Sequence, residues 1–105
     1  MSKKVDIPFT LLSRAAIANG RKVCTTRAGR LGEVGDWFVL WGQVYVLADV
    51  QERNLGDVAL ELFRQEGFDS PETFINYWQS IHRKGFDEGR TYYVHWFGHW
   101  AGGCE

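Results

Sequence analysis

The chain has 105 residues, enough for one hydrophobic core and too few for two, so we expect a single domain over residues 1–105. Five Trp, four Tyr and seven Phe make it rich in aromatic residues, which argues against intrinsic disorder. The net charge of −1 hides an asymmetry, because residues 1–32 carry seven Lys/Arg and one Asp, whereas residues 33–105 carry five Lys/Arg and twelve Asp/Glu. A basic segment on an acidic body indicates either a local anion site or two halves whose charges pair across the fold.

The sequence also excludes some locations. No apolar run reaches the roughly 18 residues that a membrane span requires, so we expect no membrane partner. The N-terminus does not read as a signal peptide, because Asp6 and Pro8 follow closely after two lysines. We therefore expect a cytoplasmic protein in which Cys24 and Cys104 are free thiols rather than a disulfide.

The first elements lead into the basic segment. Residues 5–9 form an apolar run that predicts a short strand, which Pro8 confines to the edge or end of a sheet. Thr10 is a suitable N-cap for a helix over residues 11–19, and Gly20 suits the C′ position that follows it.

The segment after this helix, GRKVCTTR, packs three basic side chains and two hydroxyls into the eight residues 20–27. Its alternation predicts a strand, with Lys22 and Thr26 on one face and Thr25 and Arg27 on the other. We expect this segment to form the floor of a site for an anionic or strongly polar ligand. Cys24 lies among these basic residues, which would lower its pKa, although a partly buried strand thiol is the commoner case.

The middle of the chain reads as a loop and a hairpin. Residues 29–36 contain three glycines and predict a loop with turns. Residues 37–41 and 44–50 predict two strands, and Gly42-Gln43 between them fits a type II′ turn.

The last third predicts two helices and a strand. Asn54 and Ser70 are suited to begin the helices, and Gly67 and Gly85 are suited to end them. Residues 90–97 predict a final strand. Strands without regular βαβ alternation favour an α+β fold in which a small mixed or antiparallel sheet curls into a barrel.

Several motifs, taken in order, make the chain resemble the ASCH domain family, small proteins built on the β-barrel of the PUA RNA-binding domain. The resemblance covers nearly the whole chain. It rests on the spacing of Gly20, Lys22, Thr25 and Arg27, on Gly35-Asp36, on Gln65-Glu66-Gly67-Phe68 and on the closing strand Tyr93-Val94-His95-Trp96-Phe97. It implies a small PUA-like mixed β-barrel with helices packed on the outside, and RNA or a modified nucleoside as the ligand.

One branch of that family is similar in a further respect, namely bacterial amidohydrolases that remove the acetyl group from N4-acetylcytidine. The resemblance implies Lys22 as base, Thr25 as nucleophile and Glu66 as proton shuttle or orienting group. In a regular strand Lys22 and Thr25 point to opposite faces, so this mechanism requires a turn or bulge after Gly20. The alternative is that Lys22 contacts a phosphate or pairs with Glu66, and that Thr25 is only a strand residue.

Further residues are predicted to hold the ligand. They are Gly20, Arg21, Arg27, Arg30 and Trp41, the last by stacking on a base. We expect no metal or other cofactor, because His95 and His99 have the spacing of metal ligands but lack a third. The first hypothesis is therefore an RNA- or nucleoside-binding module with a basic cleft; an amidohydrolase is the alternative, and a ribonuclease is a third.

Overall fold

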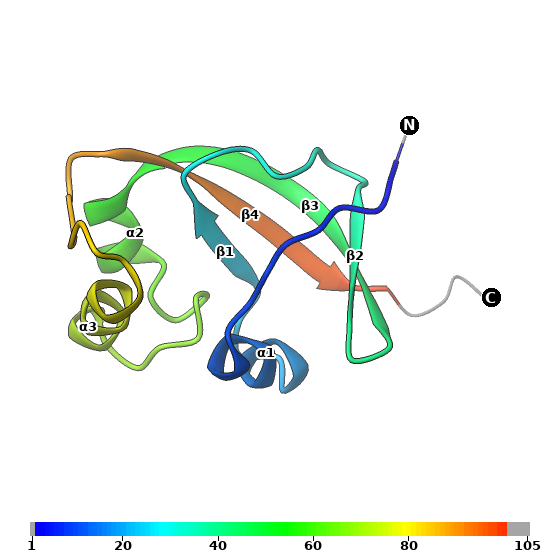
Figure 1. Cartoon of the computed structure of the whole chain (residues 1–105), viewed down its shortest axis with the longest axis horizontal. Coiled ribbons are helices and arrows are strands. Elements are labelled where there is room, and N and C mark those ends of the chain that lie inside the picture. Colours follow the sequence, from blue (N-terminus) through cyan, green and yellow to red (C-terminus); the bar gives the residue numbers. More distant parts are fainter. Residues whose placement is uncertain (1, 101–105) are drawn as a thin grey trace.

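The structure is a computed structural model that describes residues 2–100. The elements, in chain order, are α1 (Leu11–Ala18), β1 (Cys24–Arg27), β2 (Trp37–Leu40), β3 (Gln43–Asn54), α2 (Leu55–Glu61), α3 (Pro71–Ile81) and β4 (Thr91–His99). The four strands form one antiparallel sheet in the order β1-β4-β3-β2. In the view of Figure 1, α2 and α3 lie at one end of the sheet and α1 lies below β1. The predicted thiol of Cys104 lies outside the described residues.

The sheet curves because its two long strands bend together. β3 and β4 pair along most of their length, with a shift in register between Leu47 and Asp49 that increases the local bend (Figure 1). All strand pairs are antiparallel, and one isolated parallel bridge joins Lys4, which lies outside the strands, to Trp37. This confirms the predicted α+β fold with a curled sheet and helices on its outside.

Local sequence rules account for the helix ends. The Thr10 hydroxyl accepts a hydrogen bond from the Ser13 amide at 3.3 Å, as an N-cap does. Gly20 has a φ of +84°, and the Arg21 amide reaches back to the Ala16 carbonyl at 2.9 Å, which closes α1 with a Schellman motif. Both ends of α1 are therefore as predicted.

The predicted strand over residues 5–9 is wrong. The pairing in this region is limited to Lys4 and Trp37, together with a hydrogen bond from the Val5 amide to the Trp37 carbonyl at 2.7 Å. Pro8 has no amide hydrogen with which to continue a ladder. The alternation that suggested a strand is nevertheless real, because the side chains at positions 5, 7 and 9 are all buried.

The predicted hairpin turn is also wrong by one residue. Leu40 pairs with Gln43, so Trp41 and Gly42 form the turn. Their φ angles are +49° and +78°, and two positive φ angles define a type I′ turn rather than a type II′ turn. The error arose because a tryptophan rarely adopts a positive φ.

Other boundaries differ by a few residues. β1 occupies only Cys24–Arg27, the second half of the segment 20–27 that predicted a strand, and α2 ends at Glu61 rather than just before Gly67. Asn54 occupies the N-cap position of α2, but its side chain makes no capping hydrogen bond. Ser70 does cap α3, since its hydroxyl accepts from the Thr73 amide at 3.1 Å.

Two clusters of buried side chains form the core. One joins the N-terminal segment, α1 and the β2–β3 hairpin: Val5, Ile7, Phe9, Ile17, Phe38, Leu40, Tyr45, Leu47 and Phe97. The other joins α2 and α3 to the sheet: Cys24, Leu55, Val58, Ala59, Leu62, Phe74, Trp78, Tyr92 and Val94. None of the helices in residues 2–100 has the length and apolar character needed to cross a membrane.

Candidate functional site beside the first strand

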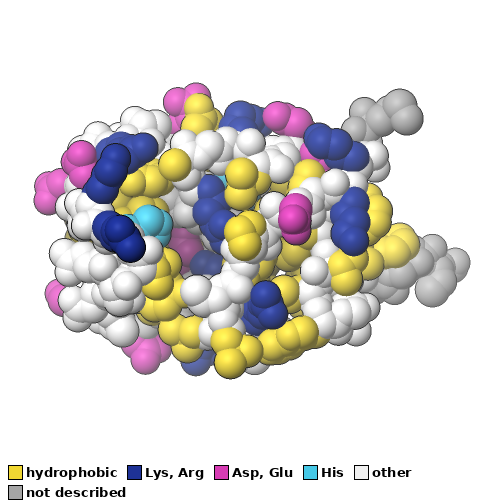
Figure 2. Space-filling model, viewed as in Figure 1, with side chains coloured by type: hydrophobic (Ala, Val, Ile, Leu, Met, Phe, Trp, Pro, Cys, Tyr) yellow, Lys and Arg dark blue, Asp and Glu magenta, His cyan; other side chains and the backbone are white. Residues whose placement is uncertain are grey.

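A cavity of about 160 Å³ lies beside β1, between the beginning of α1 and the side of α3. Its lining residues are Pro8, Thr10, Ser13, Lys22, Thr25, Thr26, Arg27, Glu66, Phe68, Phe74, Tyr77, Trp78, Ile81 and His82. Figure 2 shows this face of the molecule hollowed, with acidic and basic side chains lying deep in it. A cavity of about 150 Å³ accommodates a benzene molecule, so this one can hold a single six-membered ring.

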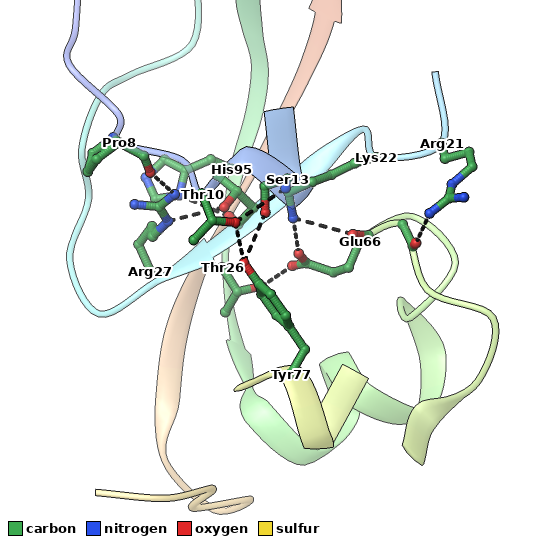
Figure 3. Close-up of polar contacts among 12 residues, drawn as sticks. Pro8, Thr10, Ser13, Arg21, Lys22, Thr26, Arg27, Glu66, Tyr77 and His95 are labelled. Carbon is green, nitrogen blue, oxygen red and sulfur yellow. Dashed lines mark hydrogen bonds and ion pairs between the residues drawn. The ribbon is translucent and has the colours of Figure 1, made fainter. Parts of the chain in front are cut away.

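Glu66 organises the polar side of the cavity. Its Oε1 lies 2.5 Å from the Lys22 ammonium, and its Oε2 accepts a hydrogen bond of 2.5 Å from the Thr26 hydroxyl (Figure 3). Lys22 Nζ also donates to the Glu66 main-chain oxygen at 3.4 Å. The Lys22 and Glu66 side chains are only 6% and 3% exposed, so each charge depends on the other for compensation.

The backbone brings this pair together at close range. Lys22 forms an isolated antiparallel bridge with Glu66, which ties the entry to β1 to the α2–α3 connection. Gly67 follows with a φ of +96°, and a Cβ there would lie 3.2 Å from the Ala16 Cβ and 3.3 Å from the Lys22 Cβ. Glycine therefore permits both the turn and the close approach that place the carboxylate on the lysine.

Strand alternation decides which threonine joins Glu66. The Thr25 hydroxyl accepts a hydrogen bond from Arg27 Nε at 3.1 Å, on the other side of β1 from Lys22 and Thr26. Thr25 still lines the cavity, but its hydroxyl pairs with Arg27 rather than with Lys22 or Glu66. The hydrogen-bonded set is therefore Lys22, Thr26 and Glu66. Sequence reasoning placed Lys22 and Thr26 on one face but assigned the chemical role to Thr25.

Arg27 is held by the N-terminal segment. Its Nη2 donates to the Pro8 carbonyl at 2.5 Å, and its guanidinium lies 5.1 Å from the centre of the Phe9 ring. Burial lowers the pKa of Arg27 from its usual value. Arg27 thus lines the cavity, but its Nε and Nη2 already donate to Thr25 and Pro8.

A second polar group faces the first across the cavity. The Tyr77 hydroxyl, carried by α3, hydrogen-bonds the Thr10 hydroxyl and lies 3.5 Å from that of Ser13 (Figure 3). The Phe68 ring lies 5.2 Å from the Tyr77 ring and extends the same wall. None of these residues was predicted to line a site: Thr10 was predicted only as a helix cap, and Tyr77 lies in α3, far from Thr10 in the sequence.

Four predicted ligand residues line no part of this cavity: Gly20, Arg21, Arg30 and Trp41. Arg21 donates to the Gly67 carbonyl at 2.9 Å. Arg30 forms two hydrogen bonds with Glu33, at 3.2 and 2.6 Å, and these raise the pKa of Arg30 and lower that of Glu33. Trp41 is exposed in the hairpin turn.

Cys24 and His95 are buried next to the site. Burial and the neighbouring Glu66 carboxylate raise the pKa of the Cys24 thiol, so Cys24 is not the activated thiolate that basic neighbours alone would give. His95 Nε2 accepts from the Leu31 amide at 3.0 Å, while its Nδ1 faces the Thr25 carbonyl at 3.4 Å. Burial lowers the pKa of His95, which favours the neutral ring that this pairing needs.

His95 and His99 do not share a site. His99 Nε2 lies 2.7 Å from the Gln43 side-chain oxygen, whereas His95 is bound to the Gly-rich loop. Within residues 2–100, no three His, Cys, Asp or Glu side chains are grouped so that they could hold a metal ion.

Comparisons with known proteins identify the fold. No family model matches the sequence, and no curated protein matches it. The chain is similar in structure to an ASCH domain from Lactobacillus crispatus JV V101, with a TM-score of 0.63 and 15% identity over 93% of this chain and 79% of that one. It is also similar to the hypothetical protein PH0355, with a TM-score of 0.68 and 12% identity over 95% of this chain and 100% of that one. The chain therefore has the fold of an ASCH domain, as its sequence motifs implied.

Proposed function

We propose that the cavity beside β1 binds one planar base, belonging to RNA or to a modified nucleoside. The observation that carries this proposal is the ring-sized volume of about 160 Å³ with a fixed polar set at one side, Lys22, Thr26 and Glu66. Such a site selects a flat ligand by its shape and orients it by hydrogen bonds to its edge.

The polar set offers a matched donor and acceptor. An ammonium has three hydrogens, and Lys22 directs two of them at Glu66 oxygens, so a third is available to a ligand carbonyl. Each Glu66 carboxylate oxygen accepts one bond in the structure and has a second lone pair for a ligand N–H. A ring edge with an N–H next to a C=O, as in uracil and guanine, matches this pair.

Aromatic side chains support the same ligand class. Phe68 and Tyr77 are half-buried and line the cavity, so their surfaces can contact a ring. Base–aromatic stacking contributes about 1–3 kcal/mol per base and tolerates different bases.

Binding can be tested with nucleosides and with variants of the polar set. Isothermal titration against cytidine, N4-acetylcytidine, uridine and adenosine should give measurable affinity for at least one of them. Thr26→Val should weaken it by about tenfold, because the Glu66 carboxylate that accepts from the ligand loses the hydrogen bond that holds it in place. Arg30→Ala, outside the cavity, should leave the affinity unchanged. Equal affinities of the wild type and Thr26→Val, or no binding of any nucleoside or short RNA, would overturn the proposal.

One observation favours a second function, hydrolysis of an amide on the bound base. The Thr26 hydroxyl donates to the Glu66 carboxylate, the contact a base needs to take its proton. Thr26 Oγ would attack the amide carbonyl, Glu66 would pass the proton to the leaving amine, and Lys22 would stabilise the oxyanion. Water would then release the acyl group from Thr26.

Acetate release from N4-acetylcytidine tests this function. Both assignments predict loss of turnover in Lys22→Met. The geometry predicts loss also in Thr26→Val, whereas the family resemblance predicts it in Thr25→Val. Absence of acetate release by concentrated wild-type protein would remove the hydrolase function and leave the binding function standing.

A further inference from the structure

A groove of about 290 Å³ continues the cavity past the C-terminal end of α3. The two hollows share five lining residues: Thr26, Arg27, Trp78, Ile81 and His82. The groove then extends along the loop after α3 to the beginning of β4, through Arg83, Lys84 and Arg90. The groove therefore lies directly next to the cavity.

The groove is basic and contains no acidic side chain in its lining. Arg83, Lys84 and Arg90 are exposed, and none of them forms an ion pair with a residue in the range 2–100. Three other exposed or half-exposed basic residues do pair with carboxylates: Lys3, Arg30 and Arg53. Figure 2 shows basic side chains and a histidine gathered beside the hollow.

These basic side chains come from the part of the chain that is otherwise acidic. Residues 33–105 carry only five basic side chains against twelve acidic ones, and three of those five lie on this groove. An unpaired group of cations in an acidic part of the chain creates a local positive potential that attracts an anion.

The helix dipole of α3 explains only part of the arrangement. His82 Nδ1 lies 3.0 Å from the Trp78 carbonyl, and cations after a helix C-terminus are generally stabilised by its partial negative charge. Arg90, however, comes from the segment before β4, and its guanidinium lies 5.1 Å from the Tyr92 ring centre. Two separate segments thus bring cations to one groove.

We propose that this groove holds a phosphate attached to the base in the cavity, so that the ligand is a nucleotide rather than a free nucleoside. The inference rests on the proposed base-binding function and adds the class of ligand. Arginine suits the role, because its planar fork donates two parallel hydrogen bonds to a phosphate. The phosphate belongs either to a mononucleotide or to a strand of RNA, and the two sources differ in the test below.

The test compares ligands that differ by one phosphate. Isothermal titration at fixed low salt measures the affinity of cytidine and N4-acetylcytidine, of their 3′- and 5′-monophosphates, and of a five-nucleotide single-stranded RNA containing the same base. One monophosphate should bind about tenfold more tightly than its nucleoside, from two partly exposed charged contacts. RNA that binds no more tightly than the mononucleotide identifies the free nucleotide as the ligand, and a further gain identifies the strand.

Matched variants test whether the groove is responsible for the difference in affinity between nucleotide and nucleoside. Arg83→Ala with Lys84→Ala should remove the difference between nucleotide and nucleoside while leaving nucleoside affinity unchanged. Lys4→Ala with Arg64→Ala removes the same charge from exposed residues that do not line the groove, and should keep the difference. Arg90→Gln should reduce the difference without neutralising the α3 end. Thermal melts of each variant establish that it is folded.

Failure of the phosphate site and failure of the base site give different results. Nucleosides that bind while phosphate adds less than about twofold would overturn the phosphate site and leave the base site intact. The phosphate site would also be overturned if the groove double variant kept the same difference in affinity between nucleotide and nucleoside as the control variant. If no nucleoside, nucleotide or RNA binds, both proposals are wrong.

Discussion

Replacing Glu66 with glutamine should destabilise the fold by about 3–5 kcal/mol, because it removes the countercharge of a buried lysine. Water cannot replace this countercharge, because the Lys22 and Glu66 side chains are only 6% and 3% exposed and their charged atoms are 2.5 Å apart. Small domains have free energies of unfolding of about 5–15 kcal/mol, so the substitution removes at least about a fifth of the total. The midpoint of thermal unfolding should fall by at least about 12 °C.

The double variant Lys22→Met with Glu66→Gln separates charge from packing. It removes both charges, keeps similar side-chain volumes and leaves an acceptor for Thr26, so it should be within about 2 kcal/mol of the wild type. Urea unfolding followed by the fluorescence of the five Trp residues measures Glu66→Gln, Lys22→Met and the double variant against the wild type. A loss below about 1 kcal/mol for Glu66→Gln, or a double variant whose loss equals the sum of the single losses, would refute this reasoning.

Three further predictions concern buried titratable groups. The pKa of His95 is lowered in the folded state, so the unfolded state takes up the proton first as the pH falls. The free energy of unfolding should therefore fall as the pH drops below about 6.5, and it should fall less in His95→Gln. Nitrogen NMR should show a neutral His95 ring whose Nε2 accepts from the Leu31 amide. The pKa of Asp36 is lowered mainly by a hydrogen bond from the Glu33 backbone amide, and also by one from the Lys3 side chain. The stability that Asp36 contributes should be present above about pH 3.9 and lost at lower pH. Acid should therefore change the free energy of unfolding of Asp36→Asn less than that of the wild type. Cys24 is buried with a raised pKa, so in a Cys104→Ser background iodoacetamide should label it only on unfolding, and rapid labelling of the native protein would contradict its placement.

Local sequence rules predicted the elements whose ends depend on neighbouring residues. Thr10 and Gly20 bound α1 as expected, and Ser70 begins α3, because each end is closed by hydrogen bonds within five residues. The alternation of residues 22–27 correctly put Lys22 and Thr26 on one face, which follows from strand geometry alone.

Contacts between segments far apart in the sequence could not be predicted from local patterns. The order β1-β4-β3-β2 places β1 next to a strand nearly seventy residues later, and no local pattern specifies that neighbour. The cavity wall likewise depends on Tyr77 reaching Thr10 across the molecule. The hairpin turn was missed for a different reason, since Trp41 adopts a φ that its residue type disfavours.

The spacing in GRKVCTTR and its geometry lead to different chemical roles. Spacing alone makes Thr25 the partner of Lys22, but a regular strand turns Thr25 toward Arg27, and Arg27 is fixed in turn by the Pro8 carbonyl. A catalytic Thr25 would therefore have to break its bond with Arg27 and reach across the strand to a base. Thr26 already donates to Glu66, which Lys22 also contacts, so it needs no such rearrangement. The backbone after Gly20 thus makes a role for Thr26 the simpler hypothesis, and only a variant that distinguishes the two adjacent hydroxyls can decide between them.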